Sequence, residues 1–191
     1  MVRVLLGIVL GAILAPVVVV AWLCFGRVPV AVVDPPLPQE QLLTAVPLHA
    51  RIQRELVRTV PIPADGNNLA AGAEVYRDQC AGCHGFHGKP SSFAAHMYPD
   101  APPLWEKHHN NDAVGVSDDP PSETYWKVAN GIRLTGMPSF KQVLTDKQIW
   151  QVSVLLAYAN KPLPPAAVDI LKGVPPPAPS PAAVSAPPGK K

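Results

Sequence analysis

Charge is scarce in this chain of 191 residues, of which 16% are Asp, Glu, Lys or Arg. The 16 basic and 14 acidic residues give a formal net charge of +2. This mild balance excludes nucleic acid as the main partner, because phosphate binding needs clustered positive charge. Cysteine is also rare, and the three present are too few for a disulfide scaffold or a four-cysteine zinc site.

Proline, in contrast, is abundant, with 25 residues. This proportion is too high for one compact fold, so part of the chain must be linker or tail. The length allows one domain of roughly 100–150 residues with appendages. We expect an N-terminal anchor at 1–27, a proline-containing connector with a short helix at 28–68, a folded domain at 69–162 and a Pro/Ala-rich tail at 163–191.

The N-terminus is predicted to be a transmembrane helix. The 22 residues from Val4 to Phe25 carry no charge and lie between Arg3 and Arg27. At 1.5 Å per residue such a helix spans roughly 30 Å, the thickness of the hydrocarbon core of a bilayer. A cleaved signal peptide is the alternative, but the apolar run is long and no A-x-A cleavage site follows it.

The connector contains a helical pattern over residues 47–58, with Leu48, Ile52 and Leu56 on one stripe. Prolines at 61 and 63 are expected to end this helix. We expect the stripe to pack on the chain's own folded domain, and docking on a partner or on lipid is the alternative.

Three helices are predicted within residues 69–162, and no segment alternates like a strand, so the fold class is all-α. The first helix follows Asn68 as its cap, and the second covers 123–129 and stops at Gly131. The third follows a capping box that begins at Thr145. The tail lacks aromatic residues and is expected to be disordered after about residue 174.

The sequence Cys80-Ala-Gly-Cys83-His84 is C-x-x-C-H, the signature of c-type haem attachment. On a helix end, this spacing lets both thiols form thioethers to one haem, with the imidazole beneath the iron. A thioredoxin-like dithiol would need a βαβ setting, and a zinc site would need a second ligand pair. Chance occurrence of so short a pattern is a further alternative.

A haem held by His84 needs a sixth ligand, and Met137 provides a thioether in the loop from Gly131 to Pro138. The soft sulfur stabilises Fe(II) and raises the reduction potential. Gly136 would let the backbone approach the haem closely. Packing in the core is the alternative role of Met137, and Met97 is the second candidate thioether.

Residues 69–160 resemble the class I, monohaem cytochromes c, in particular the membrane-anchored bacterial type. The resemblance includes Gly72 and Tyr76 on the first helix, and Leu155 and Tyr158 at the end of the last. In that family these helices cross at near right angles, and the glycine allows their close approach.

Residues 101–104, Ala-Pro-Pro-Leu, resemble the family's Gly-Pro-x-Leu loop, although Ala101 replaces the glycine. The match implies that the carbonyl of Pro102 accepts the Nδ1 proton of His84, which fixes the ligating tautomer.

The resemblance implies one covalent haem c, held by Cys80 and Cys83, with His84 as proximal and Met137 as distal iron ligand and with Tyr76 at the haem site. Because both axial positions would be filled, we expect an electron carrier rather than an enzyme. It would serve as a tethered shuttle or as the haem subunit of a membrane complex, with redox proteins as partners. An open-site haem enzyme, a gas-sensing haem domain and a structural anchor subunit are the alternatives.

Covalent haem attachment takes place outside the bacterial cytoplasm. Residues 26–191 are therefore expected on the periplasmic side of the inner membrane, with residues 4–25 in the lipid.

Three further sets of side chains have two interpretations each. Four histidines suggest a second metal or a histidine as the sixth haem ligand, but we expect exposed or hydrogen-bonded rings: His87, His96, His108 and His109. Four aromatic residues are expected to wall the haem pocket or fill the core: Trp105, Tyr125, Trp126 and Trp150. Four basic residues either rim the haem edge for an acidic partner or form ordinary surface: Lys89, Lys127, Arg133 and Lys141.

Overall fold

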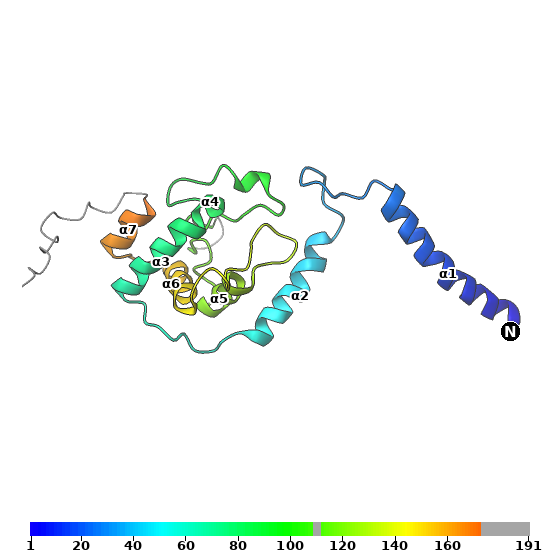
Figure 1. The fold of residues 1–191 in the computed structure, drawn as a ribbon, viewed down its shortest axis with the longest axis horizontal. Helices are drawn as coiled ribbons and strands as arrows, with labels where there is room; N and C mark the ends of the chain where they lie inside the picture. Colours follow the sequence, from blue (N-terminus) through cyan, green and yellow to red (C-terminus); the bar gives the residue numbers. More distant parts are fainter. Residues whose placement is uncertain (109–111, 173–191) are drawn as a thin grey trace, which may run out of the picture. The chain divides into compact units, whose positions relative to one another are not determined.

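A computed structural model describes residues 1–108 and 112–172, and this part of the chain is all-helical, as predicted. The chain divides into two compact units, of which the first is Met1–Pro47 and the second begins at Leu48 (Figure 1). The elements are α1 (Val2–Phe25), α2 (Glu40–Glu55), α3 (Gly66–Gln79), α4 (Ala81–His84), the 3₁₀ helix η1 (Ala94–His96), α5 (Pro121–Asn130), α6 (Asp146–Ala157) and α7 (Pro165–Leu171).

Helix α1 contains the whole predicted apolar run and accommodates Pro16 in its interior. Among the described residues it is the one helix long and apolar enough to cross a membrane. A signal sequence near an N-terminus can also form a long apolar helix, so α1 alone fits both alternatives.

Helix α2 begins at Glu40, so the prediction that it starts at Pro47 is wrong. The carboxylate of Glu40 accepts a hydrogen bond from the Leu37 N–H (2.8 Å), which fixes the N-terminal turn. Pro47 lies inside the helix although it lacks an N–H for the helical ladder. The helix ends at Glu55, before the two prolines expected to stop it.

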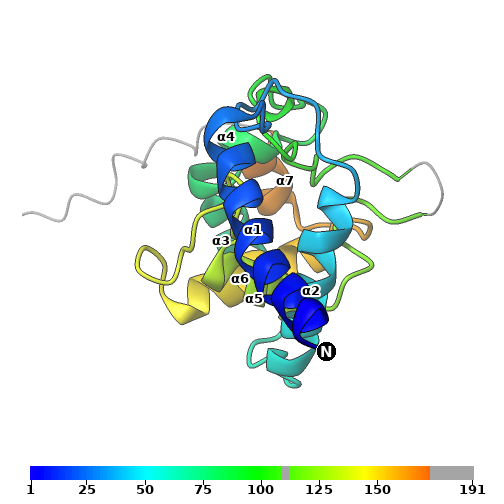
Figure 2. The ribbon, with the colours of Figure 1, turned by 90° about the vertical axis from the view of Figure 1, so that its right-hand side faces the viewer.

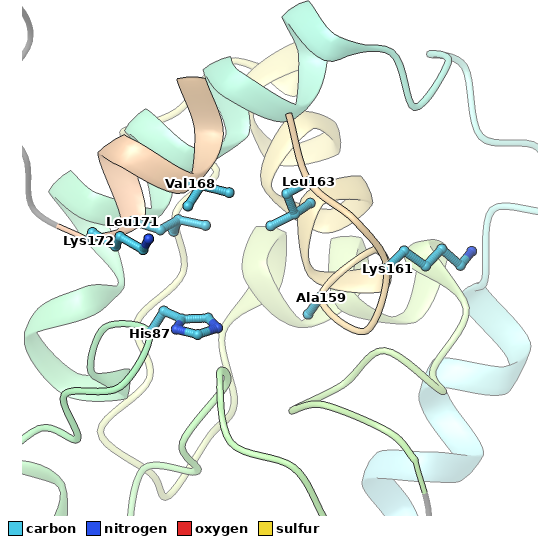
Figure 3. A pocket seen from close by; sticks show the side chains of 7 residues that line it. All are labelled: His87, Ala159, Lys161, Leu163, Val168, Leu171 and Lys172. Atoms are coloured by element: carbon cyan, nitrogen blue, oxygen red, sulfur yellow. The ribbon is translucent and has the colours of Figure 1, made fainter. Parts of the chain in front are cut away.

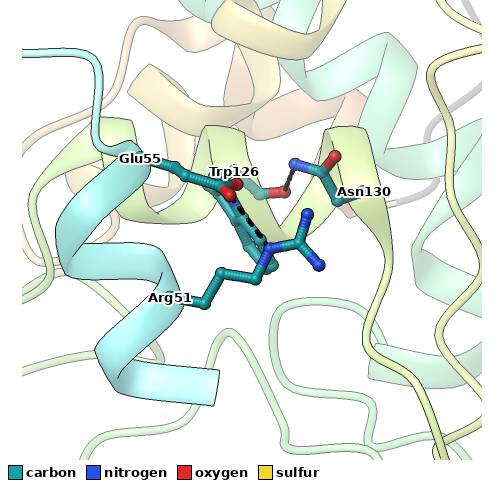
Figure 4. A network of polar contacts seen from close by, with 4 residues as sticks. All are labelled: Arg51, Glu55, Trp126 and Asn130. Atoms are coloured by element: carbon teal, nitrogen blue, oxygen red, sulfur yellow. Dashed lines mark hydrogen bonds and ion pairs between the residues drawn. The ribbon is translucent and has the colours of Figure 1, made fainter. Parts of the chain in front are cut away.

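The C-terminal half of α2 packs on the folded unit through α5 (Figure 4). The indole N–H of Trp126 donates to Glu55 (2.8 Å), and the Arg51 guanidinium lies 5.8 Å from the centre of the Trp126 ring. Arg51 and Glu55 also form an ion pair at 3.0 Å. Ile52, on the turn between them, is completely buried. Of the predicted stripe, Ile52 is buried within its own unit, whereas Leu48 and Leu56 are half-buried.

Replacing Ile52 by Ala is expected to lower the free energy of unfolding by about 2–5 kcal/mol, the usual cost of emptying a buried aliphatic site. Gln53→Ala on the exposed face of the same helix is the control, and we expect it to change little. Urea unfolding of the holoprotein measures both. Equal stabilities of the two variants would show that this helix does not pack in solution.

Helices α3 and α6 form the centre of the core, and α7 and α5 flank them (Figure 2). The buried face of α3 includes Leu69, Ala73 and Tyr76, as the pattern predicts. Its cap, however, is Asp65 rather than Asn68, and the Asp65 carboxylate accepts from the Asn68 N–H (2.9 Å). The other two helix-end signals are confirmed: α6 has its capping box, and α5 stops at a glycine with a positive φ of 69°.

The close approach of α3 and α6 depends on Gly72. A Cβ at this position would lie 2.4 Å from the backbone carbonyl oxygen of Gln151, so the helices would have to separate. Gly72→Ala is expected to cost about 1–3 kcal/mol of stability, as overpacking does. Gly66→Ala on the same helix is the matched control, because its Cβ would meet only Pro164, at 4.0 Å. Thermal unfolding distinguishes them, and an unchanged melting temperature for Gly72→Ala would contradict this packing.

The folded unit extends beyond residue 162, so the predicted start of the tail at residue 163 is wrong. Helix α7 packs against α3 and buries Ala167 and Leu171 almost completely. Pro165 occupies the first turn, where a missing N–H costs nothing. The prediction of disorder after about residue 174 lies outside the described residues.

Candidate functional site

The C-x-x-C-H motif lies where α3 gives way to α4. Cys80 is the C-cap residue of α3 and also the N-cap residue of α4. Cys83 and His84 lie within the single turn of α4. The buried hydroxyl of Tyr76 donates to the carbonyl of Gly85 (2.7 Å), directly after the motif. Tyr76 therefore ties the end of α4 back onto α3.

His84 has a defined tautomer. Its Nδ1 lies 2.8 Å from the carbonyl oxygen of Pro102, the contact that the resemblance implies. Because a carbonyl only accepts, Nδ1 carries the proton and Nε2 keeps its lone pair. Burial lowers the pKa of His84, although the Pro102 hydrogen bond opposes the shift. The ring is therefore neutral at physiological pH, the state that binds metals.

The Cys80 thiol lacks the lowered pKa of a redox-active thiol. Burial, and then the neighbouring Cys83, raise the pKa of Cys80 to about 12. Dithiol oxidoreductases need a thiol with a lowered pKa, so this thiol is poorly suited to that role. Residues 1–108 and 112–172 contain no group of three or more His, Cys, Asp or Glu side chains that could hold a metal. The raised pKa of Cys80 weighs against the redox dithiol alternative.

The loop that carries Met137 is anchored to the end of α5. The Ser139 hydroxyl donates to the Ala129 carbonyl (2.6 Å), and the Phe140 N–H donates to the Val128 carbonyl (3.0 Å). Gly131 turns the chain with a positive φ, and a Cβ there would lie 2.7 Å from the Pro138 backbone. Met137 is half-buried and packs on the same core cluster as Cys80.

These residues fit the haem that the motif indicates. The donor set consists of two protonatable thiols, a neutral imidazole with a free Nε2 and a thioether. Nearby, the Trp105 ring packs edge-on against Tyr76 with centroids 5.4 Å apart. The buried Trp105 Nε1 has no hydrogen-bond partner among the described residues, and an unpaired buried N–H is costly. A bound group with acceptor atoms would satisfy it.

The other aromatic residues have separate roles. Tyr125 and Trp150 stack with ring centroids 4.2 Å apart, and the Tyr125 hydroxyl donates to Asp146. Trp126 lies under the end of α2 through its contacts with Arg51 and Glu55.

Lys127 does not belong to a free basic rim, because it is paired within the chain. Its ammonium lies 2.8 Å from Glu123 and 3.1 Å from Asp119. Burial lowers the pKa of Lys127, but these two carboxylates outweigh that effect and raise it above its ordinary value. The other three basic candidates are exposed: Lys89, Arg133 and Lys141.

The histidines outside the motif are exposed where the structure describes them. His87 is exposed and lines a surface cavity of about 130 Å³ beside α7 (Figure 3). His96 ends η1, and His108 is exposed. His109 lies outside the described residues.

Sequence reasoning missed two supports of the site. The Ser91 hydroxyl donates to the Gly82 carbonyl inside the motif (2.7 Å) and so ties the following segment to α4. Gly85 has a φ of 76°, and a Cβ there would meet the backbone of Lys89 at 2.8 Å. The glycine directly after the motif was the available signal for this tight turn.

Comparison with known proteins agrees with this geometry. Residues 67–156 match the family described as cytochrome c oxidase, cbb3-type, subunit III. This part of the chain is a c-type cytochrome domain, and its single attachment motif is consistent with the class I, monohaem type.

A curated relative, the thiosulfate dehydrogenase of Stutzerimonas stutzeri (strain A1501), is 25% identical over 129 residues, which cover 67% of this chain. The match covers 39% of the relative's own length. No solved structure matches the chain.

Proposed function

We propose that this chain is a membrane-anchored, monohaem electron carrier. Cys80 and Cys83 would hold one haem c by thioethers, His84 would bind the iron through Nε2, and Met137 would be the distal ligand. When bound, the haem supplies a one-electron Fe(III)/Fe(II) couple. The carrier would exchange electrons with redox proteins or within a membrane complex.

The observation that carries this proposal is the 2.8 Å contact between His84 Nδ1 and the Pro102 carbonyl. A metal-bound histidine commonly donates its second ring N–H to a carbonyl or carboxylate, which orients the ring and raises the basicity of the ligating nitrogen. In this chain the acceptor comes from a loop 18 residues away, so the ring is held in place by the fold.

Each residue would have a distinct part in electron transfer. The two thiols would fix the haem so that it cannot leave, and His84 would keep one axial side filled. The thioether of Met137 would fill the other and favour Fe(II). With both positions filled, electron transfer would involve little change of ligands.

The relative's name suggests a second class of function, since a dehydrogenase is an enzyme. The chain spans about two-fifths of that relative's length. We propose the carrier because the chain offers two axial ligands for one haem, and an enzyme acting at the iron would need an open position.

The proposed cellular location of the protein is based on where haem is attached covalently to c-type cytochromes. Helix α1 would remain as a single-pass anchor in a bacterial inner membrane, and the domain that begins at Leu48 would face the periplasm, where c-type haem is attached. Mass spectrometry of the mature membrane protein tests this, because a cleaved signal peptide would remove residues 1–25.

An optical spectrum of the purified holoprotein tests the carrier proposal. We expect narrow reduced bands, a weak sulfur-to-iron band in the red for the oxidised form, and no response of the reduced form to carbon monoxide. A high-spin spectrum that shifts with carbon monoxide would instead support an open-site enzyme or gas sensor.

A further inference from the structure

The side chain of Met97 lies against the backbone of Gly136, the residue before Met137. If residue 136 had a Cβ, it would lie 2.1 Å from the terminal methyl of Met97 and 3.8 Å from its sulfur. The methyl group of Met97, the far end of a flexible side chain, therefore fills the space beside Gly136 and would have to move if residue 136 had a Cβ. Met97 itself is half-buried.

The hydrogen bonds around Met137 lie within its own loop. The Met137 N–H donates to the Thr135 hydroxyl (3.1 Å), and its carbonyl accepts from the Ile132 N–H (3.2 Å). These bonds shape the loop, whose C-terminal end is attached to α5 by the hydrogen bonds of Ser139 and Phe140. Met97 contacts the loop from a different segment, directly after η1.

That segment is itself fixed to the attachment motif. The Ser91 hydroxyl donates to the Gly82 carbonyl (2.7 Å) and also accepts from the Phe93 N–H (3.1 Å). The segment from Ser91 to Met97 therefore connects the attachment motif, which carries His84, to the loop that carries Met137.

We propose that Met97 is a positioning residue, whose methyl group seated on Gly136 holds the loop so that the sulfur of Met137 stays on the iron. This inference rests on the proposed function, in which Met137 is the distal ligand. A side chain at residue 136 would displace the Met97 methyl group from this place.

Four variants of the holoprotein test the contact: Met97→Ala, Met97→Leu, Gly136→Ala and the double variant Met97→Ala/Gly136→Ala. Met97→Ala is expected to weaken the sulfur–iron bond by about tenfold, as loss of an outer-shell partner does. The readouts are a smaller sulfur-to-iron band and a correspondingly tighter binding of carbon monoxide. Met97→Leu should restore both, because it keeps the volume of the side chain.

The Gly136 variants test the same contact from the other side. Gly136→Ala should weaken the sulfur-to-iron band because its Cβ would displace the Met97 methyl group from its place beside the loop. The double variant should recover part of the band, since truncation of Met97 makes room for the new methyl group, and this non-additivity is a signature of direct contact. Purely additive losses would contradict the proposal.

Two outcomes separate this inference from the proposed function. A wild-type protein without the sulfur-to-iron band would contradict Met137 as the ligand, and the inference with it. A wild-type band that Met97→Ala leaves unchanged would overturn the inference alone. If Met97→Leu abolishes the band while Met137→Leu keeps it, Met97 is the ligand and its positioning role is wrong.

Discussion

Replacing both Cys80 and Cys83 by Ala is expected to abolish covalent haem and, with it, most of the folded structure of the second unit. The reason is the size of the domain: a small core built around a cofactor loses a large share of its buried surface when the cofactor is not retained. Far-ultraviolet circular dichroism and haem staining of the denatured protein measure the two effects.

The third cysteine supplies the control. Cys24 lies in α1, exposed and outside the motif, so Cys24→Ala should keep both the haem and the fold. A double variant with a circular dichroism spectrum like that of the holoprotein would contradict the prediction that the fold depends on the cofactor.

Replacement of Met137 by Leu is expected to have the second large effect. Leucine has a similar volume, so the contacts of Met137 with the core cluster should survive while the sulfur is lost. We expect the sulfur-to-iron band to disappear, the reduced protein to bind carbon monoxide and the reduction potential to fall, because a ligand that favours Fe(II) is missing.

A melting temperature close to that of the wild type would show that Met137→Leu has changed the iron and not the fold. Retention of the band in this variant would place the sulfur ligand elsewhere, and Met97 would then be the first residue to test. The same spectra therefore decide between the two methionines.

The sequence allowed prediction of the features that depend on local patterns. Periodicity gave α3 and α6, the capping box at Thr145 gave the start of α6, and Gly131 gave the end of α5. The attachment motif could be recognised because its spacing is dictated by the chemistry of one cofactor. These signals lie within a few residues of the structure they determine.

The errors arose where a distant contact decides the outcome. Helix α7 lies in a Pro/Ala-rich segment whose composition suggests a tail, yet packing against α3 stabilises it. The contact of Met97 with Gly136 joins two loops, and no periodicity could predict it.

The packing of α2 on α5 also sets the length of the linker between the anchor and the folded unit in the proposed membrane-anchored protein. Because the folded unit begins at Leu48, residues 26–47 alone separate it from α1, and those from Glu40 onward are helical. Such a segment reaches roughly 60 Å at most, from about 3.3 Å per extended residue and 1.5 Å per helical one. A partner in the same membrane would meet the haem domain at a high effective concentration, and encounter would not depend on the bulk concentration of either protein. If the contacts of Ile52 and Trp126 between α2 and α5 were lost, the linker would lengthen and the domain would explore a larger volume. The contact in Figure 4 would therefore influence the rate of encounter with membrane partners.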